Sequence, residues 1–242
     1  MKNAAIGLGA IIALTATPAL AADMEFKVPP PAFSWTGFYI GAQAGGGAFD
    51  PGESEDPGVG FLLGGQAGYN YQFGMFVLGV EGEGYWAGMN DRYQYTCSSC
   101  SYVDNYTYQN NGDFDIAARA GLAFDRALIY AKGGFAMSNT RYNFNETTTS
   151  GAFDTETAAG WVPGLLIGVG LQYALPPAWT PRGSLVVGLE YNYIALNTTT
   201  LTATGTCSPG YCTPSTYTYD LDATGTKQIV KLRVDWLFNG PQ

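Results

Sequence analysis

Eight segments of this chain alternate apolar and polar residues with a period of two, and this pattern constrains the fold more than any other feature. In the second segment, for example, Phe61 and Leu63 share one face and Gln66 lies on the other. Successive side chains of a β-strand point to opposite faces of the sheet, so the pattern predicts strands with one apolar and one polar face. The segments are 35–48, 60–73, 76–87, 114–124, 127–138, 161–174, 184–193 and 226–238.

The connections between these segments alternate in length. Links from odd to even segments are long and polar, whereas links from even to odd segments are short turns such as Gly74-Met75 and Asp125-Arg126. Outer-membrane barrels have this arrangement, with short periplasmic turns and long extracellular loops. An even number of strands that are long enough to cross the bilayer at a tilt can close into a ring without unpaired edges. We therefore expect an all-β fold, an eight-stranded antiparallel up-and-down transmembrane β-barrel. The long links are 49–59, 88–113, 139–160 and 195–225.

The N-terminus predicts export from the cytoplasm. Lys2 precedes an apolar stretch that is too short for a spanning helix, and Ala19-Leu20-Ala21 matches a signal-peptidase site. Residues 1–21 are thus expected to be a signal peptide, 22–34 a Pro-rich linker and 35–242 the barrel domain. Only 13% of the residues are charged, fewer than the roughly 25% of a soluble domain, which suits a surface that faces lipid. The predicted location is the bacterial outer membrane.

The polar faces of the predicted strands place both signs of charge inside the barrel. An eight-stranded barrel has just enough interior for side chains to fill it, and an unpaired buried charge is costly. We therefore expect a salt-bridged network that plugs and rigidifies the barrel, with a narrow gated ion path as the alternative. The predicted members are Glu81, Glu83, Asp115, Arg119, Lys132, Glu190, Lys231, Arg233 and Asp235.

Several short stretches carry a family resemblance. They are Trp35-Thr36-Gly37-Phe38-Tyr39-Ile40-Gly41, Ala118-Arg119-Ala120-Gly121, Asp125-Arg126, Gly133-Gly134 and the closing run from Val230 to Phe238. Together they resemble the alphaproteobacterial outer-membrane immunogenic, porin-like family of small OmpA-like barrels, over nearly all of the chain after residue 21. The resemblance implies a surface-exposed eight-stranded barrel, and some relatives are described as porin-like or hemin-binding. Four residues, 239–242, follow the terminal aromatic Phe238, which departs from the usual ending of such strands.

Enzyme chemistry is disfavoured by the complete absence of histidine. Neither a serine nucleophile activated by histidine nor the commonest metal ligand is available. Glu81 and Glu83 could form an acid–base pair of the kind found in glycosidases, but we expect them to pair with nearby cations instead. We expect neither a cofactor nor a metal. The net charge of −9 argues against nucleic acid as a partner.

The four cysteines lie in predicted long loops, in an oxidising compartment that permits disulfides. We expect two local bonds, Cys97–Cys100 and Cys207–Cys212, while a bond between loops and a four-cysteine zinc site stay open as alternatives. Tyrosine-rich stretches in the second and fourth long links are expected to extend the hairpins above the membrane, with a ligand-binding surface as the alternative.

The functional expectation is a non-enzymatic outer-membrane protein with a structural and surface-interaction role. The alternatives are a low-conductance porin and a hemin-binding surface receptor. Expected partners are outer-membrane lipid, the barrel assembly machinery during biogenesis and an extracellular ligand held by the loops, and the expected state is a monomer.

Overall fold

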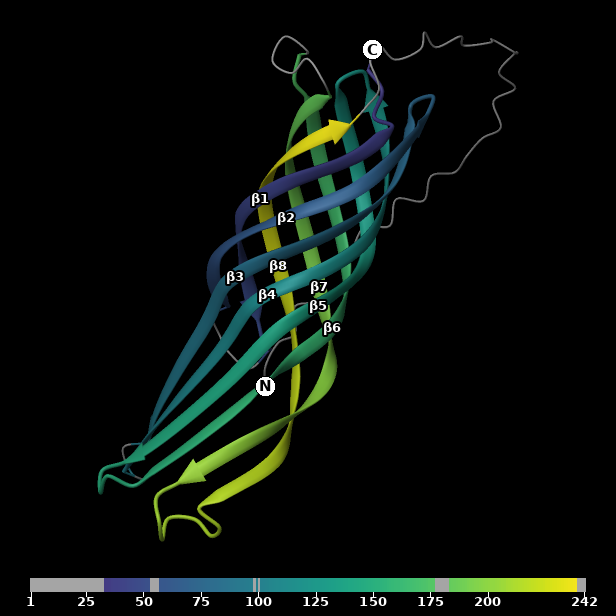
Figure 1. Cartoon of the computed structure of the whole chain (residues 1–242). Coiled ribbons are helices and arrows are strands. Elements are labelled where there is room, and N and C mark those ends of the chain that lie inside the picture. Colours follow the sequence, from purple (N-terminus) through teal and green to yellow (C-terminus); the bar gives the residue numbers. More distant parts are fainter. Residues whose placement is uncertain (1–32, 53–56, 98, 100, 177–182, 239–242) are drawn as a thin grey trace, which may run out of the picture.

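The structure is a computed structural model that describes residues 33–52, 57–97, 99, 101–176 and 183–238. Each strand pairs antiparallel with the next, and β8 pairs with β1, so that the sheet closes into a barrel (Figure 1). Within this part of the chain, no helix is long and apolar enough to cross a membrane. The predicted eight-stranded antiparallel barrel is therefore confirmed. The strands are β1 (Gly37–Asp50), β2 (Gly58–Phe73), β3 (Phe76–Cys97), β4 (Tyr102–Phe124), β5 (Ala127–Thr148), β6 (Phe153–Ala174), β7 (Ser184–Cys207) and β8 (Thr216–Phe238).

The outer face of the barrel carries a belt of exposed apolar side chains. Phe61 is 80% exposed and Phe135 is 72% exposed, values that would be costly in water but suit contact with lipid tails. Phe73 and Phe76 stack at the turn end of the belt, and Trp86 and Trp161 are exposed at its other end. The alternation seen in the sequence thus turns one face of each strand towards lipid and the other towards the interior.

Two of the short turns lie where the sequence predicts them. Gly74 joins β2 to β3 with a φ of 61°, a conformation that favours glycine, and Asp125 joins β4 to β5 with a φ of 53°. The third connection, between β6 and β7, includes residues 177–182, which lie outside the described part.

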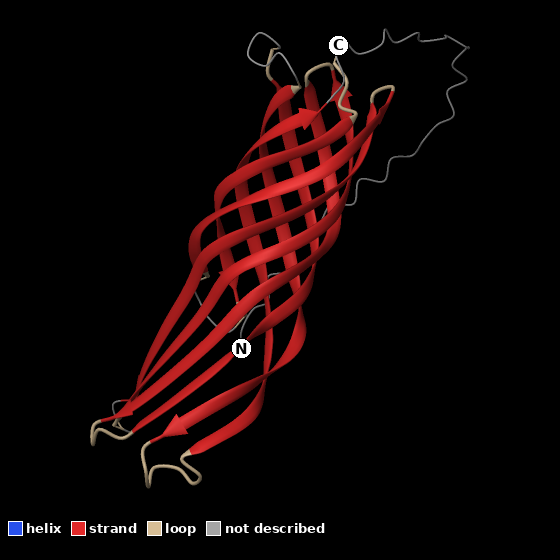
Figure 2. Cartoon of the chain, in the orientation of Figure 1, coloured by secondary structure: helices blue, strands red, loops and turns tan. Residues whose placement is uncertain are grey.

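The predicted long loops are corrected by the structure. Three of the four, 88–113, 139–160 and 195–225, consist mostly of strand, because β3 to β8 continue well beyond the apolar belt as paired hairpins (Figure 2). The alternating tyrosines and threonines of these stretches have high β-propensity, and continued pairing satisfies their backbone hydrogen bonds. The expectation that the tyrosine-rich stretches extend the hairpins is confirmed.

The barrel wall divides above the belt. The pairing of β6 with β7 stops after Gly164 and resumes at Thr157, so residues 158–163 of β6 have no partner on β7. Figure 1 shows the outer part of the β7–β8 hairpin bending away from the hairpins formed by β3 to β6. The outer hairpins therefore form two groups with a seam between them.

The predicted signal peptide, 1–21, and most of the predicted linker, 22–32, lie outside the described residues. The last linker residues differ from expectation, because Phe33 is almost fully buried at the turn end of the barrel. The guanidinium carbon of Arg126 lies 5.3 Å from the centre of its ring. Phe33 therefore belongs to the folded domain, whose described part begins before the predicted boundary at residue 35.

Candidate functional site: the charged interior

Glu81 on β3 is the centre of the buried charged network. Its carboxylate is 3.1 Å from Nη1 of Arg119 and 3.3 Å from Nζ of Lys132, and it also accepts a hydrogen bond from Nη2 of Arg233. These cations come from β4, β5 and β8. Glu81 thereby ties together side chains from four of the eight strands.

Two further glutamates share the same cations. Glu83 pairs with Lys132 and Lys231, and Glu190 on β7 lies 2.7 Å from Nζ of Lys132 and 3.0 Å from Nζ of Lys231. Nη1 of Arg233 is 2.7 Å from Glu190 as well. Each glutamate thus contacts at least two cations, so losing one cation leaves the other in place.

Asp235 depends on a single cation. Its Oδ2 lies 2.9 Å from Nε of Arg233, and no second Lys or Arg pairs with it among the described residues. Its other contacts are amides, since Gln66 and Gln172 each donate to it at 2.7 Å. These two glutamines belong to the polar face predicted from the sequence, although the predicted network did not include them.

Asp115 differs from the other predicted members. It lies inside the barrel and is fully buried, as expected. However, it forms no ion pair, and neither of its carboxylate oxygens has a hydrogen-bond partner among the described residues. The other eight predicted members do join one network. The structure therefore brings eight of the nine predicted residues together and leaves Asp115 buried beside them without an ion pair.

The charge count explains why one carboxylate remains alone. In the described barrel interior six carboxylates face five cations, so one negative charge has no counterpart. The carboxylates are Glu81, Glu83, Asp113, Asp115, Glu190 and Asp235, and the cations are Arg119, Lys132, Lys227, Lys231 and Arg233.

Two tyrosines that the sequence analysis did not include also belong to the network. Tyr39 donates to Oε2 of Glu81 at 2.7 Å, and Tyr130 donates to Glu190. The guanidinium carbon of Arg119 lies 3.8 Å from the centre of the Tyr130 ring, which is cation–π geometry. Both tyrosines lie at alternate strand positions that face the interior, as the charged residues do. The alternation in the sequence could therefore have identified them.

A second ion pair lies nearer the outer end of the barrel. Nζ of Lys227 is 2.5 Å from Oδ1 of Asp113 and also contacts the hydroxyl of Ser138. The sequence analysis missed Lys227, although it lies four residues before Lys231 and so on the same inward face of β8. Asp113 had been assigned to a loop, because the strand was expected to begin at residue 114.

Apolar side chains cover the charged layer at both ends. At the turn end, Phe33 and Trp35 pack with other buried residues such as Leu237, and the indole nitrogen of Trp35 donates to the carbonyl of Asp125 at 3.1 Å. At the outer end, a second apolar cluster includes Leu62 and neighbours from all seven other strands. The large ion-paired network around Glu81 therefore lies between two apolar clusters, and the Lys227–Asp113 pair lies beside Phe49 of the outer cluster.

The carboxylates of Glu81, Glu83 and Glu190 lie close enough together to hold a metal ion, with one oxygen of each within 4.8 Å of the others. Each of them, however, is already paired with lysine or arginine. A metal would have to displace these cations, so the donor set is arranged for ion pairing. The same pairing leaves none of the three as a free general base.

Of the two predicted disulfides, the structure describes Cys207–Cys212 in full, which confirms that pairing and excludes these residues from a zinc site. Cys97 is also disulfide-bonded. Its predicted partner, Cys100, lies outside the described residues.

The outer hairpins contain a tyrosine–carboxylate cluster that the sequence analysis did not foresee. Tyr217 donates to Asp154 at 2.6 Å and to Glu156 at 2.7 Å, and Tyr219 also donates to Glu156. Loss of solvent, together with these hydrogen bonds, raises the pKa of both phenols well above the usual tyrosine value. The contacts cross from β8 to β6 just beyond the interruption, where β6 pairs with β7 again, so they add to the connection between the two groups of hairpins.

Comparisons with known proteins agree with this architecture. Residues 8–223 match the model of the outer membrane protein beta-barrel domain. The 31 kDa outer-membrane immunogenic protein of Brucella melitensis is 32% identical over 217 residues, which cover 78% of this chain and 85% of that protein. The 22 kDa outer membrane protein of Rhizobium leguminosarum is 28% identical over 165 residues, covering 67% of this chain and 65% of that protein.

Among solved structures, Neisserial surface protein A aligns with 82% of this chain and 97% of its own, at 17% identity and a TM-score of 0.40. The family-model match and the Brucella relative bear out the resemblance drawn from the sequence motifs, and they place the protein in the outer membrane. The chain belongs to the outer membrane protein beta-barrel domain family.

Proposed function

We propose that this protein is a closed, non-conducting barrel that stabilises the outer membrane and carries rigid hairpins on the cell surface. The observation that carries the proposal is the filling of the described interior, in which the ion-paired network lies between two apolar clusters. An ion that crosses the barrel would have to break buried ion pairs and pass both apolar layers. Each of these steps opposes conduction.

One observation favours the alternative of a low-conductance porin. Asp115 and Asn192 are fully buried, and their side-chain oxygens have no hydrogen-bond partners within the described part of the chain. Buried polar atoms of this kind usually contact water. Any water beside Asp115 and Asn192 would be enclosed and not part of a continuous channel, because the apolar cluster around Leu62 closes the outer end of the interior.

The surface-interaction role rests on the rigidity of the hairpins. Strand pairing continues to Cys97, Thr148 and Cys207, and the Cys207–Cys212 disulfide closes the tip of the β7–β8 hairpin. Preordered hairpins lose little conformational entropy when they bind a partner, unlike flexible loops of the same length. The barrel thus acts as a monomeric anchor for a preformed binding surface.

Liposome swelling tests the closed barrel. The protein is reconstituted into vesicles loaded with dextran, and swelling is followed by light scattering in isotonic glycerol and arabinose. We expect the rates of protein-free vesicles, with a general porin as the positive control. Swelling that increases with the amount of this protein would contradict a closed interior.

Chemical labelling of intact cells tests the surface position of the hairpins. Arg92→Cys and Arg141→Cys place a thiol at exposed hairpin positions, and each variant should react with a membrane-impermeant maleimide on intact cells. The unaltered protein, whose described cysteines are disulfide-bonded, is the matched control and should not react. Labelling only after the outer membrane is permeabilised would place the hairpins on the periplasmic side and refute the proposal.

A further inference from the structure

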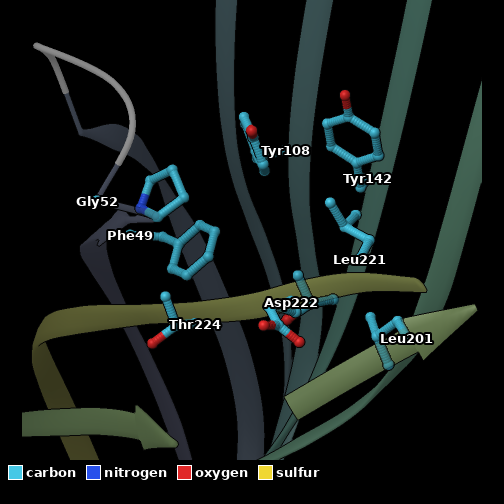
Figure 3. Close-up of a pocket in the computed structure, with 11 residues that line it drawn as sticks. Phe49, Gly52, Tyr108, Tyr142, Leu201, Leu221, Asp222 and Thr224 are labelled. Atoms are coloured by element: carbon cyan, nitrogen blue, oxygen red, sulfur yellow. The ribbon is translucent and has the colours of Figure 1, made fainter. Parts of the chain in front are cut away.

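A pocket of about 160 Å³ lies at the seam between the two groups of outer hairpins, outside the charged interior (Figure 3). Residues from β1, β4, β5, β7 and β8 surround it, together with two residues that follow β1. The lining residues are Phe49, Pro51, Gly52, Tyr108, Thr140, Tyr142, Leu201, Leu221, Asp222, Ala223 and Thr224.

The interrupted pairing of β6 and β7 accounts for this hollow. Where residues 158–163 have no partner on β7, side chains rather than backbone hydrogen bonds fill the space between the hairpins. Leu201 lies against this stretch, since a Cβ added at Gly160 would come within 2.6 Å of its side chain. The side chains of the two hairpin groups leave room between them, and the pocket lies there.

The walls of the pocket suit an aromatic ring. Phe49 lies on one side and Tyr142 on the other in Figure 3, with Leu221 of β8 below Tyr142 and Leu201 of β7 at the lower right. Aromatic and branched apolar walls attract a ring through dispersion and edge-to-face contacts. An apolar cavity of roughly 150 Å³ holds a benzene molecule, so this pocket has space for one ring with a short substituent.

Two polar side chains of the lining bear on what the substituent carries. Thr140 is buried, and its hydroxyl oxygen has no hydrogen-bond partner among the described residues. Asp222 alternates with Leu221 and Ala223, so its carboxylate lies on the exposed face of β8, where it accepts a hydrogen bond from Thr200 at 2.8 Å. No lysine or arginine belongs to the lining. The pocket therefore offers a hydroxyl to a ligand, with a negative charge close by on the outer face of β8.

The surrounding hairpins are acidic as well. Residues 88–97, 102–112, 139–148, 153–160, 196–207 and 216–225 contain seven carboxylates and two cations. The carboxylates are Asp91, Asp104, Glu146, Asp154, Glu156, Asp220 and Asp222, and the cations are Arg92 and Arg141. Such a field concentrates cations near the pocket and repels anions. A positive group near the tyrosine faces also gains cation–π attraction.

We propose that this pocket binds a small aromatic amine, with its ring between Phe49 and Tyr142 and its ammonium group in the negative field of the surrounding hairpins. This binding site lies above the charged layer, so it does not depend on whether the barrel conducts.

Calorimetric titration of the folded protein in detergent tests the proposal, with phenethylamine as the probe. We expect saturable binding of one molecule per chain. Phenylacetate, which has the same ring and the opposite charge, should bind at least ten-fold more weakly. The absence of saturable binding by phenethylamine, or equal binding of phenylacetate, would overturn the proposal.

Variants place the binding in this pocket. Ala223→Phe fills the hollow and should weaken phenethylamine binding at least ten-fold, whereas Ala159→Phe, at an exposed position of β6, should leave it unchanged. Asp222→Asn removes one of the seven hairpin carboxylates and should reduce the preference for phenethylamine over phenylacetate. Binding that survives Ala223→Phe would overturn the proposal.

Should Ala223→Phe fail to fold, Leu201→Ala gives an independent test, because it enlarges the pocket. That variant should bind 1-naphthylmethylamine at least ten-fold more tightly than the unaltered protein does. An unchanged affinity would contradict the assigned site.

Discussion

Replacing Arg233 with methionine would remove one guanidinium from the middle of the barrel and keep a side chain of similar length. Arg233 is 1% exposed and pairs with three carboxylates, those of Glu81, Glu190 and Asp235. Without it, Glu81 and Glu190 each keep two other cations, whereas Asp235 keeps only glutamine amides among the described residues. The variant thus leaves one particular buried carboxylate without a cation.

The expected cost is that of a buried ion pair that loses one partner, about 3–5 kcal/mol in the free energy of unfolding. Because the uncompensated charge is on Asp235, adding Asp235→Asn to Arg233→Met should restore most of this loss. Adding Glu190→Gln instead should not, since Glu190 still has both lysines. The two double variants differ only in which carboxylate is neutralised, so their comparison isolates the assigned contact.

Urea unfolding of the refolded protein in phospholipid vesicles, followed by tryptophan fluorescence, measures these differences. Arg141→Met is the matched control, because Arg141 is exposed on a hairpin and should change the unfolding free energy by no more than about 0.5 kcal/mol. A loss below about 1 kcal/mol for Arg233→Met would show that water screens the interior charges. Equal rescue by both second substitutions would refute the dependence of Asp235 on Arg233.

Three further predictions concern single groups. Arg119→Ala leaves Glu81 with two other cations, but it removes the hydrogen bonds to Tyr39 and Gln172 and opens a buried cavity, so it should lower the unfolding free energy by about 3 kcal/mol in the same assay; an unchanged midpoint would contradict a dry interior. Asp115→Asn removes the buried charge that lacks a partner and should raise the unfolding free energy by about 1 kcal/mol, whereas a lower midpoint would point to an undetected counterion. The pKa of Tyr217 is raised in the folded state, because the phenol is partly removed from solvent and, when neutral, donates hydrogen bonds to Asp154 and Glu156. The stability that this neutral phenol contributes to the hairpins is complete below pH about 10 and is lost as the pH rises towards the folded-state pKa. Absorbance titration at alkaline pH should show one tyrosine ionising earlier in Glu156→Gln than in the unaltered protein, and coincident curves would argue against this hydrogen bond.

The sequence was sufficient for features that depend on local alternation and local turns. The period of two assigned the inward face of every strand, so Glu81 and Arg233 were both predicted to face the interior although 152 positions separate them. The turn ends of the strands were predicted at Phe73 and Phe124, where the chain reverses at Gly74 and Asp125. Both signals lie within a few residues of the feature that they predict.

Features that depend on the stagger between strands could not be read in this way. The stagger, which is the shift in register between neighbouring strands, decides which inward-facing charges lie at the same height along the barrel axis. Alternation along a single strand therefore did not reveal that Asp115 has no partner among the described residues. It also did not reveal the seam between β6 and β7, because residues 158–163 resemble any other strand segment in the sequence. The outer hairpins were taken for loops, since their polar residues give no apolar face to mark a strand.

The central claim is that buried ion pairs and apolar layers close the barrel, and single-channel recording in a planar lipid bilayer tests it most directly. The purified, folded protein should insert without stepwise current increases in 1 M KCl, over a range of applied voltages. A stable and reproducible conductance step, obtained again with independent preparations and absent from detergent alone, would contradict the claim.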